Sequence, residues 1–246
     1  MMRPRISLRN RYVYFPISKA ANSSIKWMLY NLEAHGKIRF GARKSFRNQN
    51  QKMLVHDNFY GPLLTPWQIA TNPEIDRSLA ADGEFLKFTF VRNPFARVLS
   101  AYLDRAQHNN TGLYRMIQER TNKETFEFKE MLEVILEVPD PEREIHARSQ
   151  ASQTGTRIFS EVQVGRFETL MEDFAALVAR IYPKVDLVSE LVDMHEVMVS
   201  PSKTGASELL RTYYDSEAVE MVLAAFEMDF RELGYPRDIE SLIATP

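Results

Sequence analysis

The hydrophobic pattern of the chain indicates strands that are each followed by an amphipathic helix. Residues 12–15 form an aromatic and β-branched run, which predicts a short buried strand that ends before Pro16. The next apolar residues have the spacing of one helix face, and they are Ile25, Met28, Leu29 and Leu32. Residues 85–91 are a continuous apolar and β-branched run, typical of a strand covered on both faces. We expect this second strand to be central.

Further elements are indicated along the rest of the chain. Asn93 is a good N-cap residue and Pro94 suits the first helical position, so a helix is expected directly after the central strand. We expect Thr125 to open another helix, residues 161–167 to form a strand with a turn, and Gly234 to close the last helical stripe. The apolar positions of the three later helices are Phe128, Met131, Leu132, Ile135 and Leu136; Leu170, Phe174, Leu177, Val178 and Ile181; and Val219, Val222, Leu223, Phe226, Phe230 and Leu233.

Strands that alternate with helices predict an α/β fold with a mainly parallel central sheet and helices on both faces. The 246 residues are 44% hydrophobic and 26% charged, the composition of an ordinary globular protein that can bury a substantial core. We therefore expect residues 1–246 to form a single domain.

Charge and cysteine content narrow the function classes. The chain has 31 basic and 33 acidic side chains and a formal charge of −2, so no overall field favours nucleic acid, and an anion site has to be local. It has no cysteine, which excludes disulfides, thiolate metal sites and cysteine nucleophiles. No window approaches the roughly 18 apolar residues of a membrane span, and no apolar segment follows the basic N-terminus. We expect a soluble, unprocessed, cytoplasmic protein without stable membrane insertion.

The first candidate site lies where the first strand passes into its helix. Its residues are Lys19, Ala20, Ala21, Asn22, Ser23 and Ser24. Two alanines let backbone amides approach an anion, the hydroxyls add donors, and Lys19 adds a charge at a helix N-terminus, where anions are favoured. The segment has no glycine and its lysine comes first, unlike a Gly-x-x-x-x-Gly-Lys-Ser/Thr loop, so ATP hydrolysis is disfavoured. The alternative is a capped helix with a solvated lysine.

The second candidate site lies at the end of the central strand. Arg92 offers a forked donor set that suits a terminal phosphate, and it directly precedes a helix. Ser100 lies two turns into that helix and shares a face with Arg97. Each residue alone is more simply an ion-pair or packing residue. Two such segments in one chain favour a site that holds both phosphorylated ends of one nucleotide.

These segments resemble motifs of the carbohydrate sulfotransferases, sulfotransferase family 2. Residues 19–26 resemble the loop that binds the 5'-phosphosulfate of 3'-phosphoadenosine 5'-phosphosulfate (PAPS), and residues 91–102 resemble the 3'-phosphate motif of the same family. Further similar stretches are residues 145–150, 164–174 and 229–235, so the resemblance covers most of 12–236. Two departures are that Pro16 stands three residues before Lys19, where the family often has Pro-Lys adjacent, and that the cysteines and membrane anchor of Golgi members are missing.

The resemblance implies a P-loop-like, three-layer fold and a sulfotransferase that moves a sulfuryl group from PAPS to a hydroxyl, most simply of a carbohydrate, and releases PAP. Residues 19–24 would hold the 5'-phosphosulfate, while Arg92 and Ser100 would hold the 3'-phosphate. Lys19 would also stabilise the leaving phosphate. No metal is expected, because the chain has neither a His-Glu-x-x-His motif nor an aspartate-rich calcium loop.

The reaction also needs a base for the acceptor hydroxyl, and histidine suits this role near neutral pH. Of the five histidines, His56 follows a predicted strand and precedes Asp57, and family members often have a catalytic histidine between the two nucleotide motifs. We predict His56 as the base, with His146 as the alternative; His146 could instead only line the acceptor groove. Glu168 is interpreted as a structural ion-pair residue, and residues 203–205 as a surface turn that could close over the 3'-phosphate.

Two other functions remain open from the residues. A small-molecule kinase of the P-loop type would share the arrangement of strand, phosphate loop and helix, and it would bind ATP with magnesium. A catalytically silent nucleotide-binding module would bind PAP without turnover.

Overall fold

The computed structural model describes residues 4–7, 9–35, 83–107, 111–154, 162–184 and 205–243. Four strands form one sheet in the order β1-β2-β3-β4. Their bounds are β1 Arg5–Ser7, β2 Tyr12–Phe15, β3 Leu86–Val91 and β4 Gln163–Arg166. β1 runs antiparallel to β2, and the other neighbours are parallel. The predicted α/β class with a mainly parallel sheet is confirmed, and β3 lies between β2 and β4 as expected. The pattern did not predict β1.

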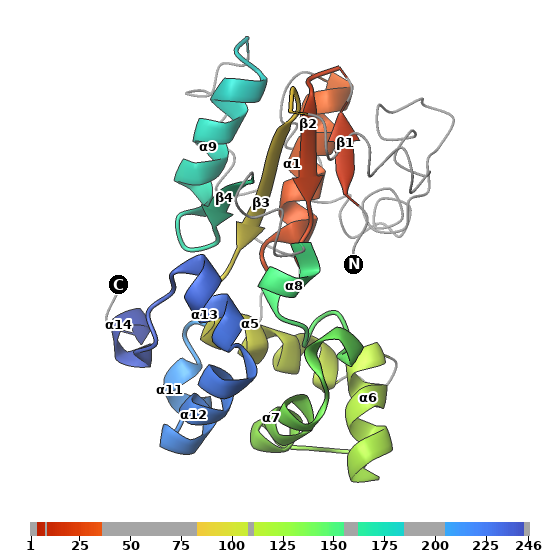
Figure 1. Cartoon of the computed structure of the whole chain (residues 1–246), viewed down its shortest axis with the longest axis vertical. Helices are drawn as coiled ribbons and strands as arrows, with labels where there is room; N and C mark the ends of the chain where they lie inside the picture. The colour runs from red at the N-terminus through yellow and green to blue at the C-terminus, as the bar shows by residue number, and fades with distance from the viewer. Residues whose placement is uncertain are drawn as a thin grey trace.

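The helices of the described residues fall into two groups. α1 (Asn22–His35) and α9 (Leu170–Ile181) lie beside the sheet, whereas most of the others gather beyond the carboxyl ends of the parallel strands (Figure 1). The remaining helices are α5 (Pro94–Ala101), the π-helix η2 (Tyr102–Ala106), α6 (Gly112–Thr121), α7 (Phe128–Glu137), the short 3-10 helix η3 (Asp140–Glu142), α8 (Gln150–Thr154), α11 (Leu210–Tyr213), α12 (Ser216–Ala225), α13 (Glu227–Leu233) and α14 (Ile239–Ile243).

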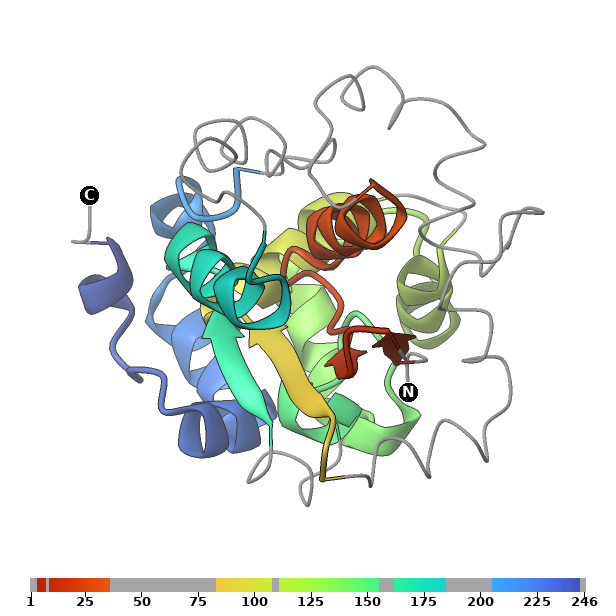
Figure 2. The ribbon, with the colours of Figure 1, turned by 90° about the horizontal axis from the view of Figure 1, so that it is seen from above.

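One face of the sheet is aromatic, and α1 and α9 cover it (Figure 2). Alternate residues of a strand point to the same side, so Tyr12 and Tyr14 of β2 meet Phe88 and Phe90 of β3 there. The rings of Tyr14 and Phe88 stack with their centroids 5.2 Å apart. This packing explains why the aromatic run forms strand β2. It also fixes the position of the end of β2, where the loop to α1 begins.

Gly165 of β4 is required by the same aromatic face. A Cβ atom at this position would lie 2.5 Å from Cε1 of Phe90, on the strand paired with it. Real Cβ contacts are essentially never that short, so glycine at this position leaves room for the ring of Phe90.

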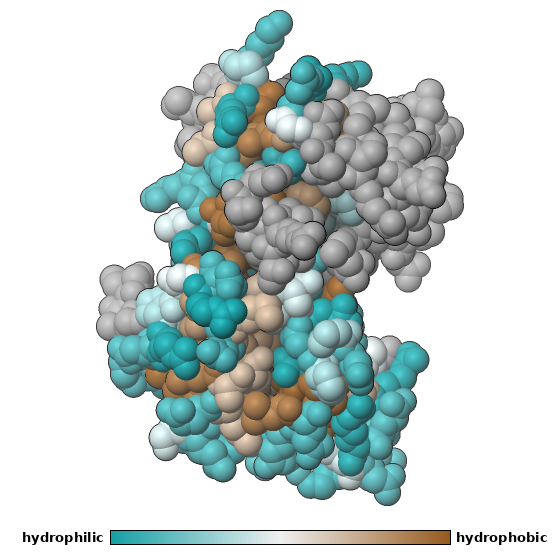
Figure 3. Space-filling model, in the orientation of Figure 1, coloured by the Kyte–Doolittle hydropathy of each residue, from teal (hydrophilic) through white to brown (hydrophobic). Residues whose placement is uncertain are grey.

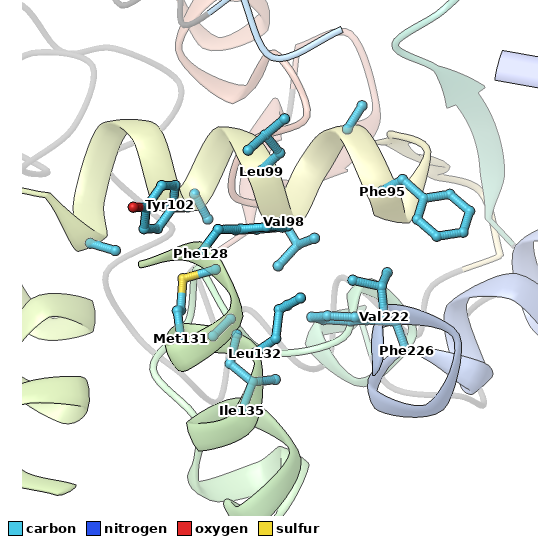
Figure 4. Close-up of a cluster of buried hydrophobic side chains, with 14 of the residues drawn as sticks. Phe95, Val98, Leu99, Tyr102, Phe128, Met131, Leu132, Ile135, Val222 and Phe226 are labelled. Carbon is cyan, nitrogen blue, oxygen red and sulfur yellow. The ribbon is translucent and has the colours of Figure 1, made fainter. Parts of the chain in front are cut away.

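The helical part has a core of its own. Figure 4 shows α5 facing α7 and α12, with apolar side chains from all three helices between them. The labelled residues are Phe95, Val98, Leu99, Tyr102, Phe128, Met131, Leu132, Ile135, Val222 and Phe226. Figure 3 shows mainly hydrophilic side chains over the outer surface of this part, with a band of hydrophobic ones between them. The core anchors α5, the helix that follows Arg92.

Three details of the predicted helices were wrong. α7 begins at Phe128 and not at Thr125, because Glu127 is its N-cap and exchanges hydrogen bonds with Glu130 in a capping box. Leu136 is 40% exposed and does not belong to the buried stripe of α7. The C-terminal stripe is split at Phe226 into α12 and α13, which end as predicted at Gly234, with a φ of 63°.

Candidate active site

The loop from β2 to α1 bends through two non-glycine residues with positive φ. Lys19 has a φ of 65° and Ala21 a φ of 55°, while Ala20 between them is fully buried. Residues other than glycine rarely adopt this region, and such strain concentrates at binding and catalytic sites. α1 begins directly afterwards at Asn22, with the amide of Ile25 donating to the carbonyl of Ala21 at 3.0 Å. The loop therefore turns without the glycines of a P-loop.

The first turn of α1 holds the other residues predicted to bind phosphosulfate. Asn22 and Ser23 are half-buried, and Ser24 is buried. Asn22 Oδ1 accepts a hydrogen bond of 3.4 Å from the hydroxyl of Tyr14, which lies in the preceding strand. The amides of a first helical turn have no carbonyl partner within the helix, and the helix dipole favours an anion beside them. The arrangement can accept an anion next to Lys19.

Arg97 of α5 fixes the backbone immediately before Lys19. Its side chain is almost fully buried, with Nε donating to the carbonyl of Ser18 at 3.0 Å and Nη2 to Ser18 Oγ at 3.2 Å. Ser18 Oγ in turn donates to the carbonyl of Ile145 at 2.9 Å. Arg97 thus joins three segments that are distant in sequence, and its role is to shape the loop.

The guanidinium of Arg92 reaches the same loop. Its Nη1 lies 3.5 Å from the carbonyl oxygen of Lys19, its Nη2 donates to Ser207 Oγ at 3.3 Å, and its centre lies 4.2 Å from the ring centroid of Phe167. Arg92 Nε is buried and has no acceptor among the described residues. Burial lowers the pKa of Arg92 to about 10, and the nearby Glu168 acts in the opposite direction. A buried cation with an unused donor is suited to an anionic ligand.

The backbone of Arg92 is held by Gln150 at the start of α8. The amide of Arg92 donates to Gln150 Oε1 at 2.9 Å, and Gln150 Nε2 donates back to its carbonyl at 2.8 Å. Asp229 of α13 accepts the amides of Gln150 and Ala151, each at 2.9 Å, and so caps α8. Burial raises the pKa of Asp229, and the charge of Arg97 partly opposes this. Helices α8 and α13 therefore set the position of Arg92.

One side of α5 and η2 lies along the Lys19 loop. Arg97, Ser100 and Asp104 follow one another at intervals of three and four residues, which brings them to one side of the helix. Arg97 bonds to Ser18, Asp104 bonds to Lys19, and the buried Ser100 lies between them on this side. Ser100 thus lies on the side of α5 from which Arg97 contacts the loop, and its contact with the donor stays a prediction.

Lys19 and Asp104 form a largely buried ion pair. Lys19 Nζ lies 2.9 Å from Asp104 Oδ2, and the side chains are 11% and 18% exposed. Burial lowers the pKa of Lys19, and the charge of Asp104 and its hydrogen bond partly restore it. Burial also raises the pKa of Asp104, but Lys19 outweighs this and holds it below its usual range.

His146 lies beside the same loop and is paired with Glu144. The His146 Nδ1 is 2.9 Å from each carboxylate oxygen of Glu144, and its backbone amide donates to Glu144 Oε2 at 2.7 Å. Burial raises the pKa of Glu144, but the hydrogen bonds and charge of His146 bring it below the usual range. Ile145, between the two, accepts the hydrogen bond of Ser18. This is the arrangement of a histidine oriented by a carboxylate.

Two parts of the predicted site lie wholly or mostly outside the described residues. His56 is outside them, so its assignment as the base stays a prediction. Of the turn at 203–205, only Gly205 is described, two residues before Ser207, whose hydroxyl contacts Arg92.

Glu168 has the structural role that was predicted for it, although through hydrogen bonds. Its Oε1 accepts the amide of Asn93 at 2.8 Å, and its Oε2 accepts the hydroxyl of Tyr235 at 3.0 Å. It therefore supports the start of α5.

Comparison with known protein families shows the family to which the chain belongs. The model of the sulfotransferase family matches residues 4–236, nearly the whole chain. The chain belongs to the sulfotransferase family. Its activity is accordingly the transfer of a sulfuryl group, and its sheet and helices are those of a P-loop-like sulfotransferase fold.

The same chain has no match among curated proteins and none among solved structures. In the part of this sulfotransferase that the structure describes, no group of three or more histidine, aspartate or glutamate side chains could hold a metal ion. No described helix is both long enough and apolar enough to cross a membrane.

Sequence reasoning missed four residues that contact Lys19 or Arg92, the two predicted cations of the site. Asp104 pairs with Lys19, Gln150 holds the backbone of Arg92, Phe167 lies under its guanidinium, and Ser207 bonds to its Nη2. Asp104 follows Ser100 by four residues on the same side of the helix, and Gln150 and Phe167 lie in stretches that resemble the family. None of these signals names the partner of Lys19 or Arg92.

Proposed function

We propose that this sulfotransferase uses PAPS as its donor, transfers the sulfuryl group to a hydroxyl acceptor and releases PAP. The observation that carries the proposal is the contact between Arg92 Nη1 and the carbonyl of Lys19, at 3.5 Å. It brings together the two segments that resemble the 5'-phosphosulfate loop and the 3'-phosphate motif. A nucleotide with phosphate groups at both its 5' and 3' positions is the donor that such a pair of anion anchors suits.

The residues near Lys19 suit a transfer in which the acceptor oxygen bonds to sulfur while the bond from sulfur to the 5'-phosphate oxygen breaks. Charge then develops on that phosphate, where the Lys19 ammonium and the first amides of α1 can stabilise it. The proton of the acceptor hydroxyl passes to a base. Positioning and charge stabilisation supply most of the acceleration in transfers of this kind.

His56 stays our predicted base, and the structure supports His146 as the alternative. His146 lies next to the loop through Ile145, and its Nδ1 is paired with Glu144. If Nδ1 donates to that carboxylate, Nε2 is the nitrogen that can take a proton from the acceptor. We propose a carbohydrate as the acceptor, on the resemblance to carbohydrate sulfotransferases.

The donor is tested by thermal shift with PAP, ATP and magnesium, NADH and coenzyme A. A ligand that binds only the folded protein raises the melting temperature, and we expect PAP to do so without added metal. Stabilisation by ATP and magnesium alone would favour a kinase. Stabilisation by PAP without turnover of PAPS on any hydroxyl acceptor of a carbohydrate panel would favour a silent binding module.

The base is tested with His56→Ala and His146→Ala side by side. Loss of a positioned base lowers turnover by about 10² to 10⁴, while the affinity for PAP should stay close to wild type. We expect His56→Ala to be the inactive variant. An active His56→Ala and an inactive His146→Ala would reverse the assignment. If both remain active, the base is a carboxylate.

A further inference from the structure

Asp104 is the one carboxylate that the structure places against the Lys19 ammonium among the described residues. The 2.9 Å pair is largely shielded from water, with side-chain exposures of 11% and 18%. Exposed ion pairs contribute little because water screens them, but shielded ones have strong effects on the charges of both partners. Asp104 therefore influences the behaviour of Lys19 directly.

The backbone that carries Asp104 is unusual. Asp104 lies in η2, a π-helix of five residues that directly continues α5. Turns of this type are rare, appear mostly as single insertions in α-helices, and are frequent at functional sites. The hydroxyl of Thr111 donates to the carbonyl of Arg105 at 2.6 Å, directly after Asp104. This geometry holds the carboxylate at the end of the helix side that runs along the Lys19 loop.

The charges around the pair come from three segments. Lys19 faces Asp104 and Arg105 from η2 and Arg92 from the end of β3. Asp104 faces Lys19, Arg105 at 2.9 Å and His146, and His146 is paired with Glu144. Lys19 is thus a partly desolvated ammonium with two arginines nearby, and Asp104 is the carboxylate that offsets them.

We propose that Asp104 is a positioning residue for sulfuryl transfer, which holds the Lys19 ammonium over the loop and keeps it charged. This inference rests on the proposed function, in which Lys19 stabilises the leaving phosphate. An ammonium has three donors, and Asp104 occupies one of them, so the charged group can contact donor phosphate while it stays anchored. Without Asp104, burial and the arginines would favour the neutral amine, which cannot stabilise that phosphate.

The protonation of Lys19 can be measured without any ligand by trace acetylation over a range from about pH 7 to about pH 11, read by mass spectrometry. We expect Asp104→Asn to shift the onset of Lys19 acetylation to lower pH by about one to three units, the range for a neighbouring opposite charge. Asp104→Glu should stay near wild type. Glu119→Gln, which removes an exposed carboxylate of α6, should leave the onset unchanged. An unchanged onset in folded Asp104→Asn would overturn the proposal.

Arg105→Gln tests the same electrostatic balance with Asp104 in place. Arg105 opposes the protonation of Lys19, so its removal should move the onset of acetylation to higher pH. This variant keeps the proposal testable if Asp104→Asn does not fold. A shift to lower pH in Arg105→Gln would contradict it.

Release of PAP from PAPS, followed against pH, then tests the functional step. In Asp104→Asn, Lys19 should lose its proton at a lower pH than in wild type. We therefore expect the fall in turnover with rising pH to begin at a lower pH in this variant, and part of the turnover to return as the pH is lowered. A purely structural role would lower turnover equally at all pH values, and such a parallel loss would overturn the positioning role. If wild type binds no PAP, the proposed function fails, while the acetylation experiment still reports whether Asp104 keeps Lys19 charged.

Discussion

The two cations proposed to bind the donor, Arg92 and Lys19, are held in different ways. Arg92 is fixed by its backbone, through two hydrogen bonds to Gln150, and its guanidinium lies over the ring of Phe167. Lys19 instead lies in a strained loop, and a carboxylate, Asp104, holds its ammonium. The first cation is anchored by neutral groups. The second has an anionic partner that occupies one of the three donors of its ammonium.

This difference fits two tasks. A group that only binds gains from a fixed position, because no ordering has to occur when the ligand arrives. A group that responds to charge developing in the reaction must be charged and near the breaking bond. The difference agrees with the proposal that Arg92 binds the 3'-phosphate and that Lys19 stabilises the leaving phosphate.

The largest effect is expected at Lys19. Lys19→Ala should lower turnover of PAPS by about 10² to 10³, by analogy with the loss of one donor to a developing negative charge. Lys19→Arg should not restore it fully, because a planar guanidinium does not replace a compact ammonium beside Asp104. Steady-state kinetics check this, with Lys184→Ala, an exposed lysine, as the control. Wild-type turnover combined with poor PAP binding would mean that Lys19 only binds.

Arg92 should show the opposite profile. Arg92→Ala is expected to weaken PAP binding by about 1.5 to 3 kcal/mol, the range for a hydrogen bond to a charged group, and to leave AMP binding nearly unchanged. Calorimetry with both nucleotides measures this. Arg180→Ala, an exposed arginine of α9, is the matched control. An equal loss for PAP and AMP would remove the assignment of Arg92 to the 3'-phosphate.

Substitution of Gln150 removes the two hydrogen bonds that hold the backbone of Arg92. Gln150→Leu leaves the buried amide and carbonyl of Arg92 without their partners, and it should lower the free energy of unfolding by about 1 to 3 kcal/mol. Urea unfolding measures the change. Gln163→Leu, at an exposed position of β4, should change stability by no more than about 0.5 kcal/mol. Equal values for the two variants would show that Gln150 does not hold Arg92.

The smallest effect is expected at Ser207. Its hydroxyl accepts from Arg92 Nη2 at 3.3 Å, so Ser207→Ala should change PAP affinity by about 0.5 to 1.5 kcal/mol, as for an ordinary hydrogen bond. Ser207→Thr, which keeps the hydroxyl, is the control. A loss as large as that of Arg92→Ala would give Ser207 a direct part in binding the nucleotide.

The sequence predicted those parts of the fold that depend on local pattern. Strand β2, central strand β3 and the Asn93 cap of α5 follow from apolar runs and cap residues, which act over a few positions. The split of the last stripe into α12 and α13 did not follow, and at the break the carbonyl of Ala225 accepts a hydrogen bond of 2.9 Å from Arg143, about eighty residues earlier. A contact at that distance leaves no periodic signal.

The site was predictable to a similar extent. Motif resemblance predicted Lys19, Arg92 and Ser100 as site residues, and the structure brings the segments of Lys19 and Arg92 together. It could not identify Asp104 or Gln150 as their partners, because a carboxylate on a helix and a buried glutamine have many ordinary roles. Which groups meet depends on tertiary packing around α5.

The most direct test of the two-anchor account is calorimetry of the wild-type protein with PAP and with AMP, in the absence of metal. The two ligands differ only by the 3'-phosphate, which Arg92 is assigned to bind. We predict that PAP binds about 10 to 100 times more tightly than AMP, the equivalent of roughly 1.5 to 3 kcal/mol. Equal affinities for the two nucleotides would contradict the account.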